Sequence, residues 1–216
     1  FGFADRRQFG AGASGSGLGP NRIVTNSAIT GDVIQNEPRN SPTCFNVAFN
    51  GDANGNPSHL GFQFLDGRKE GLEDQATGPI ASRVEMRGDA YAEEATIDSV
   101  MAKLRAVPEY VRRFQDAFPG EIASKPGELI IDEKNYSRAM AAFQRELVTR
   151  NSPYDHYVMG DDNALTTVQK QGLELFFTKA RCAECHSGPM FSDYSFVVQG
   201  VPQEGGGKDV IPGDDT

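Results

Sequence analysis

The sequence contains no tryptophan and only three cysteines and three histidines among its 216 residues. Three cysteines are too few for the disulfide framework of a small secreted scaffold. No run of about 18 apolar residues is present, so we expect no membrane span. Positive charge is also scarce, because 21 Lys and Arg against 30 Asp and Glu give a formal net charge of −9. This excess of negative charge argues against a nucleic-acid partner and fits a basic protein partner or a neutral small molecule.

An initiating methionine and a recognisable signal peptide are absent as well, since the sequence begins at Phe1. We therefore expect a processed chain or one that is incomplete at its start. The length is enough for one large domain or two small ones. Charged residues at 24% and hydrophobic residues at 38% indicate a folded protein. The 24 glycines favour long irregular loops.

Helical signals dominate the second half of the chain. Residues 92–107 have helical character, and Pro108 suits the first turn of a second helix. Asp132 is a favourable N-cap for a third helix. Thr166, with a glutamine three residues later, forms the capping box of a fourth helix. The third helix carries an apolar stripe, which predicts a buried face. Its members are Tyr136, Met140, Phe143 and Leu147.

The first part of the chain has weaker signals. Residues 1–42 are rich in Gly, Ser, Asn and Pro and indicate loop or linker. Short apolar pieces at 44–49 and 62–65 are strand-like, but two such pieces do not make a sheet. The sequence therefore predicts a mainly α fold with long irregular loops.

Cys182, Cys185 and His186 form a C-x-x-C-H motif, which is typical of a c-type haem attachment site. Two thiols three positions apart reach the two vinyl groups of one porphyrin, and the next residue places an imidazole under the iron. We expect the fourth helix to run directly into the motif and to direct this imidazole. Gly172 inside that helix would allow another helix or a flat group to approach closely.

Three other interpretations of the motif compete with haem. A redox-active C-x-x-C is one, although the βαβ context of a thioredoxin is missing. A zinc site is another, but it needs four ligands. Only Cys44, His59 and His156 remain as candidates, and none is paired at ligand spacing. A structural disulfide between Cys182 and Cys185 is the third.

The remaining histidines, the third cysteine and one methionine have plainer explanations. His59 and His156 lie in polar turns and are expected at the surface. Cys44 lies in an apolar run and is expected to be a buried thiol. Met190 follows the haem motif by four residues, which gives little reach to the opposite haem face, so we expect a core methionine rather than a ligand.

Short motifs in a fixed order extend this pattern over nearly the whole chain. They are RNSPT (39–43), NVAFN (46–50), DGR (66–68), LEDQA (72–76), GPI (78–80), VEM (84–86), AAFQREL (141–147), SPYD (152–155), GLELF (172–176) and CAECHSGP (182–189). This ordered set closely resembles the bacterial di-haem cytochrome c peroxidase family, which includes the MauG-type enzymes. Several independent motifs in the right order make the resemblance more specific than C-x-x-C-H alone.

The resemblance implies a two-domain, di-haem arrangement of cytochrome-c-like helical haem domains. Residues 1–160 would form the N-terminal, peroxide-reacting haem domain, which lacks its own C-x-x-C-H in this chain. Residues 161–216 would begin the C-terminal electron-transfer haem domain, which is cut short. Cys182, Cys185 and His186 would then hold the second haem c, with His186 bound to the iron.

The resemblance also implies roles for four residues of the first domain. Gln75 and Glu85 would line the distal pocket of the first haem, with Glu85 as the group that moves a proton between the peroxide oxygens. A carboxylate with apolar neighbours in sequence can hold a raised pKa. Pro79 would pack over the distal face of that haem. Asn40 would help to bind a calcium ion between the domains, because a neutral amide oxygen suits that hard cation.

The sequence departs from the family pattern at several places. The first C-x-x-C-H is missing, and the segment that follows it in the family resembles residues 3–7 here. The family's segment carrying the sixth ligand of the second haem would lie beyond Thr216. The loop 10–37 contains no histidine, although members that need reductive activation carry one there. Leu65 replaces a tryptophan that many members have between the haems.

These observations favour a di-haem peroxidase that reduces hydrogen peroxide with electrons from a small donor protein, either a cytochrome c or a cupredoxin. A MauG-type oxidase acting on a protein or organic substrate is one alternative, favoured by the missing loop histidine and disfavoured by Leu65. A non-catalytic electron-transfer cytochrome is another, and a haem-bearing structural subunit is a third. Covalent haem attachment takes place outside the cytoplasm in bacteria, so a periplasmic or exported protein is expected. The oligomeric state stays open, with the homodimer a form that family members often take.

Overall fold

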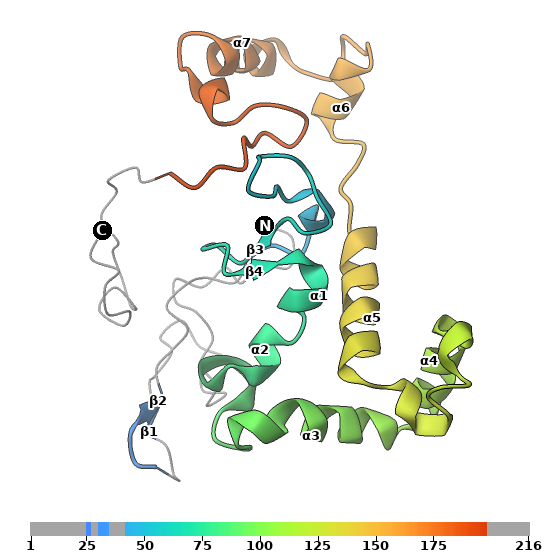
Figure 1. Ribbon diagram of the computed structural model, residues 1–216. Coiled ribbons are helices and arrows are strands. Elements are labelled where there is room, and N and C mark those ends of the chain that lie inside the picture. Colours follow the sequence, from blue (N-terminus) through green and yellow to red (C-terminus); the bar gives the residue numbers. More distant parts are fainter. Residues whose placement is uncertain (1–24, 27–29, 35–41, 198–216) are drawn as a thin grey trace.

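The structure is a computed structural model that describes residues 25–26, 30–34 and 42–197. Seven α-helices, joined by 3-10 and π turns, dominate this part of the chain (Figure 1). The α-helices are α1 Gly71–Gln75, α2 Gly78–Ala81, α3 Glu93–Arg105, α4 Pro108–Ala117, α5 Glu133–Glu146, α6 Pro153–Val158 and α7 Thr167–Phe177. The shorter turns are η1 Val47–Phe49, η2 Arg83–Arg87, η3 Pro119–Glu121, η4 Gly127–Ile130 and η5 Cys182–Glu184. The expected mainly α fold is confirmed.

Four two-residue strands form two small antiparallel hairpins. β1 Thr25–Asn26 pairs with β2 Val33–Ile34, and β3 Phe62–Gln63 pairs with β4 Lys69–Glu70. The strand-like signal at 62–65 therefore marks part of a real strand. The signal at 44–49 does not, because its second half forms the 3-10 turn η1.

The expected helix starts are confirmed by their caps. Pro108 occupies the first turn of α4, where its missing N–H and fixed φ carry no cost. The Asp132 carboxylate accepts a hydrogen bond from the Asn135 backbone N–H at 2.8 Å and caps α5. Thr166 and Gln169 form a complete capping box at α7. The helix expected over 92–107 begins at Glu93, after Ala92, and ends at Arg105.

The main core lies where α3, α4 and η4 meet. Met101, Ile130 and Ile131 are fully buried there and are surrounded by partly buried apolar side chains. A smaller cluster joins Val47 of η1 and Leu72 of α1 to α5. The two clusters hold α1, α3 and α5 together, and these helices position the segment between α1 and α3.

The buried face of α5 differs from the expected one. Met140 is 38% exposed and Phe143 is 60% exposed, so the prediction that this apolar stripe forms the buried face of the helix is wrong. The buried residues of α5 are instead Asn135, Ser137 and Ala141. Close contact with α1 and α3 favours small side chains at this face, and the Asn135 amide is satisfied because it donates to the Ile130 carbonyl oxygen at 3.0 Å.

An ion pair links α5 to α1 across a long stretch of sequence. Arg145 donates two parallel hydrogen bonds to the Glu73 carboxylate, at 2.7 and 2.8 Å. This bidentate geometry is the strong form of an Arg–carboxylate pair, and it lowers the pKa of Glu73, with burial opposing that shift. Helix α1, which carries Gln75, is therefore anchored to α5, the longest helix among the described residues.

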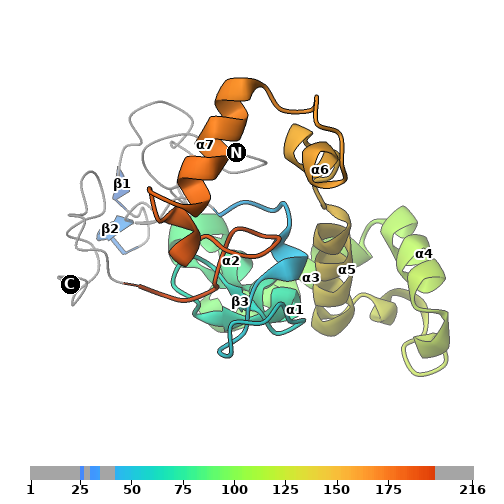
Figure 2. The ribbon, with the colours of Figure 1, turned by 90° about the horizontal axis from the view of Figure 1, so that it is seen from above.

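The segment after the cysteine motif folds back over the β3–β4 hairpin (Figures 1 and 2). The ring of Phe196 packs edge-on against Phe62, with centroids 5.6 Å apart. The side chain of Tyr194 lies against Gly51, where a larger residue would have no room. These two contacts place Tyr194 and Phe196 beside residues 51–62, next to the β3–β4 hairpin.

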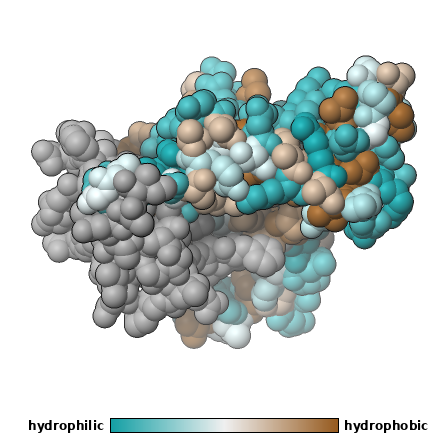
Figure 3. Space-filling view, turned by 90° about the horizontal axis from the view of Figure 1, so that it is seen from below, coloured by the Kyte–Doolittle hydropathy of each residue, from teal (hydrophilic) through white to brown (hydrophobic). Residues whose placement is uncertain are grey.

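None of the helices in the described part of the chain is both long enough and apolar enough to cross a bilayer. Viewed from the α3 side, the surface is mixed, with hydrophilic residues beside apolar ones towards the α4 end (Figure 3). The exposed apolar side chains of this region include Val107, Ile122 and Leu129.

Replacing Ile131 with alanine should lower the free energy of unfolding by roughly 2–5 kcal/mol, because a fully buried side chain would leave a cavity. Chemical denaturation of the intact protein measures this change. Ile122→Ala is the matched control, because Ile122 is 40% exposed and should cost less than about 1 kcal/mol. Equal losses for the two variants would contradict the placement of the core.

Candidate functional site

The cysteine motif follows α7 through a short turn rather than directly. The helix ends at Phe177, and Arg181 adopts a left-handed conformation with φ of 59° before η5 begins at Cys182. The expectation of a continuous helix is therefore wrong: Thr178, with ψ of −101°, departs from helical geometry. Cys182 is half-buried and Cys185 exposed, so both thiols are open to reaction.

His186 is held in one orientation by its backbone surroundings. Its Nδ1 atom lies 3.0 Å from the Phe191 carbonyl oxygen. Because a carbonyl oxygen only accepts, Nδ1 is the donor in this contact, and the neutral form of the ring then has its lone pair on Nε2. The ring of Phe176 lies beside the imidazole, with centroids 6.5 Å apart. A neutral imidazole oriented in this way is suited to bind a metal through Nε2.

The surroundings of the motif fit a flat apolar group. Three apolar side chains of α7 are uncovered: Val168 is 74% exposed, Leu175 50% and Phe177 49%. The space beside Gly172 is open, because a Cβ atom at this position would meet no neighbouring segment of the described chain within 4 Å. Two free thiols, an oriented imidazole and an uncovered apolar helix are what a covalently attached haem requires.

Other metal arrangements find less support in the described residues. All three cysteines are free thiols, and no three His, Cys, Asp or Glu side chains gather into a metal-binding group within residues 25–26, 30–34 and 42–197. His59 and His156 are exposed, as expected. Cys44 is only partly buried, which corrects the expectation of a buried thiol.

Glu85 lies in a cleft of about 340 Å³ between the β3–β4 hairpin and the segment 77–93. The residues that line the cleft are Phe64, Arg68, Lys69, Thr77, Gly78, Ala81, Ser82, Glu85 and Glu93. Burial raises the pKa of Glu85 above its ordinary value of 4.5, while a hydrogen bond with Ser82 and the charge of Arg68 act in the opposite direction. Perturbed carboxyl groups in clefts are typical of functional sites.

The positive charge of the cleft is held in place by its neighbours. The Arg68 guanidinium stacks on the Phe64 ring at 3.9 Å from the centroid and pairs with Asp66 at 2.8 Å. Lys69 pairs with Asp74 at 2.9 Å. Glu85 is therefore a half-buried carboxyl group with a fixed cation beside it, an arrangement that can hold and move a proton.

The two other expected distal residues lie on the same run of short helices. Gln75 is the last residue of α1, and Pro79 occupies the first turn of α2. Both are half-buried, but neither lines the cleft around Glu85. Of the three expected distal residues, the structure thus places Glu85 in the cleft. Gln75 and Pro79 are close to Glu85 in the sequence but do not line the cleft.

The other residues singled out in the sequence lie outside the described part of the chain or away from the cleft. Asn40, the expected calcium ligand, lies outside the described residues, as do the segment 3–7 and most of the loop 10–37. Leu65, which stands where many relatives have tryptophan, is 57% exposed at the turn between β3 and β4. Met190 is half-buried.

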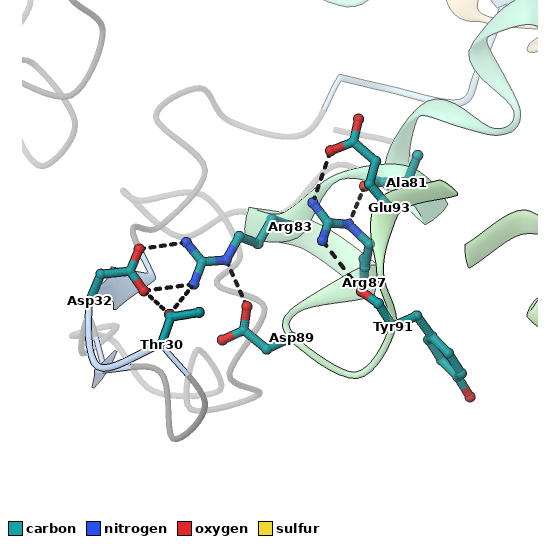
Figure 4. Close-up of polar contacts among 8 residues, drawn as sticks. All are labelled: Thr30, Asp32, Ala81, Arg83, Arg87, Asp89, Tyr91 and Glu93. Carbon is teal, nitrogen blue, oxygen red and sulfur yellow. Dashed lines mark hydrogen bonds and ion pairs between the residues drawn. The ribbon is translucent and has the colours of Figure 1, made fainter. Parts of the chain in front are cut away.

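Two arginines beside Glu85 escaped the sequence analysis. Arg83 and Arg87 stand two positions before and two positions after Glu85, in the π-helical turn η2. Both guanidinium groups make several polar contacts (Figure 4). The symmetrical R-V-E-M-R spacing was the available signal, but arginines are so often solvated that spacing alone does not reveal their partners.

Replacing Ser82 with alanine should raise the pKa of Glu85 further, because the Ser82 hydrogen bond favours the charged carboxylate. The carboxyl group would then become protonated at a higher pH than in the parent protein. Infrared titration of the carboxyl band measures the shift. Ser99→Ala is the control, since the Ser99 hydroxyl donates to the Ala95 carbonyl oxygen of its own helix at 2.7 Å. An unchanged or lower pKa in the Ser82 variant would contradict this assignment.

Comparison with known proteins identifies the family. The family model described as di-haem cytochrome c peroxidase matches residues 2–163. Cytochrome c551 peroxidase of Pseudomonas aeruginosa is 41% identical over 154 residues, which are 71% of this chain and 38% of that protein. Methylamine utilization protein MauG of Methylorubrum extorquens is 36% identical over 159 residues, which are 74% of this chain and 38% of that protein.

A solved structure agrees with these sequence matches. The crystal structure of a MauG-like protein associated with microbial copper homeostasis is similar with a TM-score of 0.56 and 28% identity, over 81% of this chain and 45% of that one. The chain thus spans less than half the length of these relatives. The matches in sequence and structure agree on one family: the chain belongs to the di-haem cytochrome c peroxidase family.

Proposed function

We propose that the full-length protein is a di-haem c-type peroxidase that reduces hydrogen peroxide with electrons from a small redox protein. The observation that carries this proposal is Glu85, a half-buried carboxyl group with a raised pKa in a cleft next to a fixed cation. The oriented His186 beside two free cysteines supports an electron-accepting haem in the same chain.

Each residue has a defined task in this proposal. Bound haem supplies the iron at which peroxide is reduced. Glu85 takes a proton from one peroxide oxygen and returns it to the other, so that the leaving oxygen departs as water. The charge of Arg68 favours the ionised form of Glu85, which must accept the proton first. Gln75 and Pro79, which do not line the Glu85 cleft, would contribute to the distal side of the first haem from the neighbouring helices α1 and α2.

The second haem is assigned to the motif after α7. The Cys182 and Cys185 thiols would hold the porphyrin through thioethers, and His186 would bind its iron. Residues 161–216 belong to this electron-transfer domain, and residues 1–160 belong to the peroxide-reacting domain. The donor is a cytochrome c or a cupredoxin, calcium binds near Asn40, and the protein is periplasmic or exported.

A MauG-type oxidase is the second candidate, because the loop 10–37 contains no histidine that could close the peroxide site. Its substrate would be a protein or an organic molecule. Leu65 weighs against it, since a leucine cannot serve as an oxidisable stepping-stone between haems. A non-catalytic electron-transfer cytochrome would leave Glu85 without a task.

One experiment on the intact, full-length protein separates these functions. Absorption spectra are recorded with the haems fully oxidised and half-reduced, and one equivalent of hydrogen peroxide is then added. A high-spin haem that reacts within the mixing time supports a peroxide site. Electron uptake from a reduced small cytochrome then favours the peroxidase, and oxidation of an added protein substrate favours the oxidase. Two low-spin haems that ignore peroxide in either state would leave only the electron carrier.

A further inference from the structure

The π-helical turn η2, which carries Glu85, has little support of its own. It lies between Ser82, in an extended conformation, and Gly88, with φ of 55°. None of its five residues is buried. Its backbone is bonded through Ser82, whose carbonyl oxygen accepts from Glu85 at 3.3 Å and from Arg87 at 3.1 Å. Such turns are rare and occur often at functional sites, and this one needs anchors outside itself.

Arg83 is the anchor at the start of the turn. Its two terminal nitrogens donate to the two carboxylate oxygens of Asp32, each at 2.8 Å, and one also donates to the Thr30 hydroxyl at 3.1 Å. Its Nε donates to Asp89 at 2.7 Å. Figure 4 shows the guanidinium between these groups, with Asp32 and Thr30 on one side and Asp89 on the other. Bidentate, charge-assisted hydrogen bonds of this kind fix orientation as well as distance.

The partners of Arg83 come from two separate places in the chain. Thr30 and Asp32 belong to the turn between β1 and β2, about fifty residues earlier. Asp89 follows the π turn directly, and its side chain is only 16% exposed. Arg83 therefore closes the turn on itself through Asp89 and joins it to a distant hairpin through Asp32.

Arg87 anchors the other end, and its partners among the described residues are local. Its Nε donates to the Ala81 carbonyl oxygen at 2.8 Å, and its terminal nitrogens lie 3.4 Å from the Tyr91 carbonyl oxygen and 3.4 Å from the Glu93 carboxylate. All three partners lie within six residues of Arg87. Of these two arginines, Arg83 is thus the one that bonds to the turn of the β1–β2 hairpin within the described part of the chain.

We infer that Arg83 is a positioning residue for Glu85, which holds the π-helical turn in place by tying it to Asp32 and Asp89. The inference rests on the proposed function, in which the orientation of Glu85 matters. It concerns the fixed direction of the carboxyl group, because Arg83 does not line the cleft. The charged groups that face Glu85 in the cleft are Arg68, Lys69 and Glu93, and none of them is among the hydrogen-bond partners of Arg83, which are Asp89, Asp32 and Thr30.

The test uses the full-length, haem-loaded protein and the variants Arg83→Gln, Arg83→Lys and Asp32→Asn. The first readout is hydrogen exchange of the amides of residues 82–89, and the second is infrared titration of the Glu85 carboxyl group. We expect exchange at least about tenfold faster in Arg83→Gln, a smaller rise in Asp32→Asn and the smallest in Arg83→Lys. Peroxide should react about ten to a hundred times more slowly in Arg83→Gln, because a small misplacement of a catalytic group has effects of this size.

Arg113→Gln is the matched control, since Arg113 makes an exposed ion pair with Glu109 on α4, at 2.7 Å. It should change neither readout. Asp32→Asn alters an exposed partner only, so it tests the link even if Arg83→Gln fails to fold. Unchanged exchange and an unchanged Glu85 titration in both Arg83→Gln and Asp32→Asn would overturn the inference. If Glu85→Gln left the peroxide reaction intact while Arg83→Gln still loosened the turn, the proposed function would fail and the anchoring by Arg83 would stand.

Discussion

Replacing Glu85 with glutamine slows the reaction of the full-length protein with hydrogen peroxide by about 10²- to 10⁴-fold, the usual contribution of a positioned acid–base group. Glutamine keeps the size and the polarity of the side chain but cannot accept the peroxide proton. Stopped-flow absorbance of the haem bands measures the rate. Glu94→Gln is the control, because Glu94 is an exposed carboxylate in the first turn of α3 and should leave the rate unchanged.

The pH profile gives the same prediction a second readout. The first proton transfer needs the ionised carboxylate, so the rate should fall as the pH drops through the pKa of Glu85. Because burial raises this pKa above 4.5, the fall should begin at a higher pH than an ordinary glutamate would cause. The acid limb should disappear in Glu85→Gln. A variant that keeps both its rate and its acid limb would show that another group moves the proton.

Replacing Cys182 and Cys185 together with alanine removes one covalently bound haem from each chain. The two thiols are the only groups in the motif that can form thioethers, and both are free and accessible. Haem-stained denaturing gels and intact mass measure the loss. A haem attached elsewhere in the full-length protein should be unaffected, so the mass should decrease by a single haem.

Cys44→Ala is the matched control for this double variant. Cys44 is the third cysteine of the chain and is also a free thiol, but it has no partner cysteine at C-x-x-C spacing and no following histidine. Its replacement should leave the haem content unchanged. Full haem content in Cys182→Ala/Cys185→Ala, or a loss in Cys44→Ala, would overturn the assignment of the motif.

Local rules of sequence predicted those features that depend on neighbouring residues. The N-caps at Asp132 and Thr166 and the proline at the start of α4 occur as expected, because a cap satisfies backbone N–H groups within three residues. The C-x-x-C-H spacing likewise predicts a haem attachment site from five adjacent residues alone. None of these features needs information from distant parts of the chain.

Burial was less predictable. The apolar stripe with Met140 and Phe143 has helical spacing, yet these side chains are exposed. Periodicity locates an apolar face but does not say how closely another helix approaches. Here α1 and α3 pack on the face of Ser137 and Ala141, so the small residues are buried and the large ones are not.

The sequence by itself therefore determined the helix starts and the cysteine motif, because each depends on residues close together in the chain. The candidate carboxylate Glu85 came instead from the resemblance of the whole ordered set of motifs to a known family. Only the tertiary structure decided the surroundings of Glu85: its cleft, its raised pKa and the anchoring of its turn by Arg83. Asp32 and Arg83 are separated by about fifty residues, and an ion pair over that distance arises from the path of the backbone. The spacing of residues along the sequence does not reveal that path.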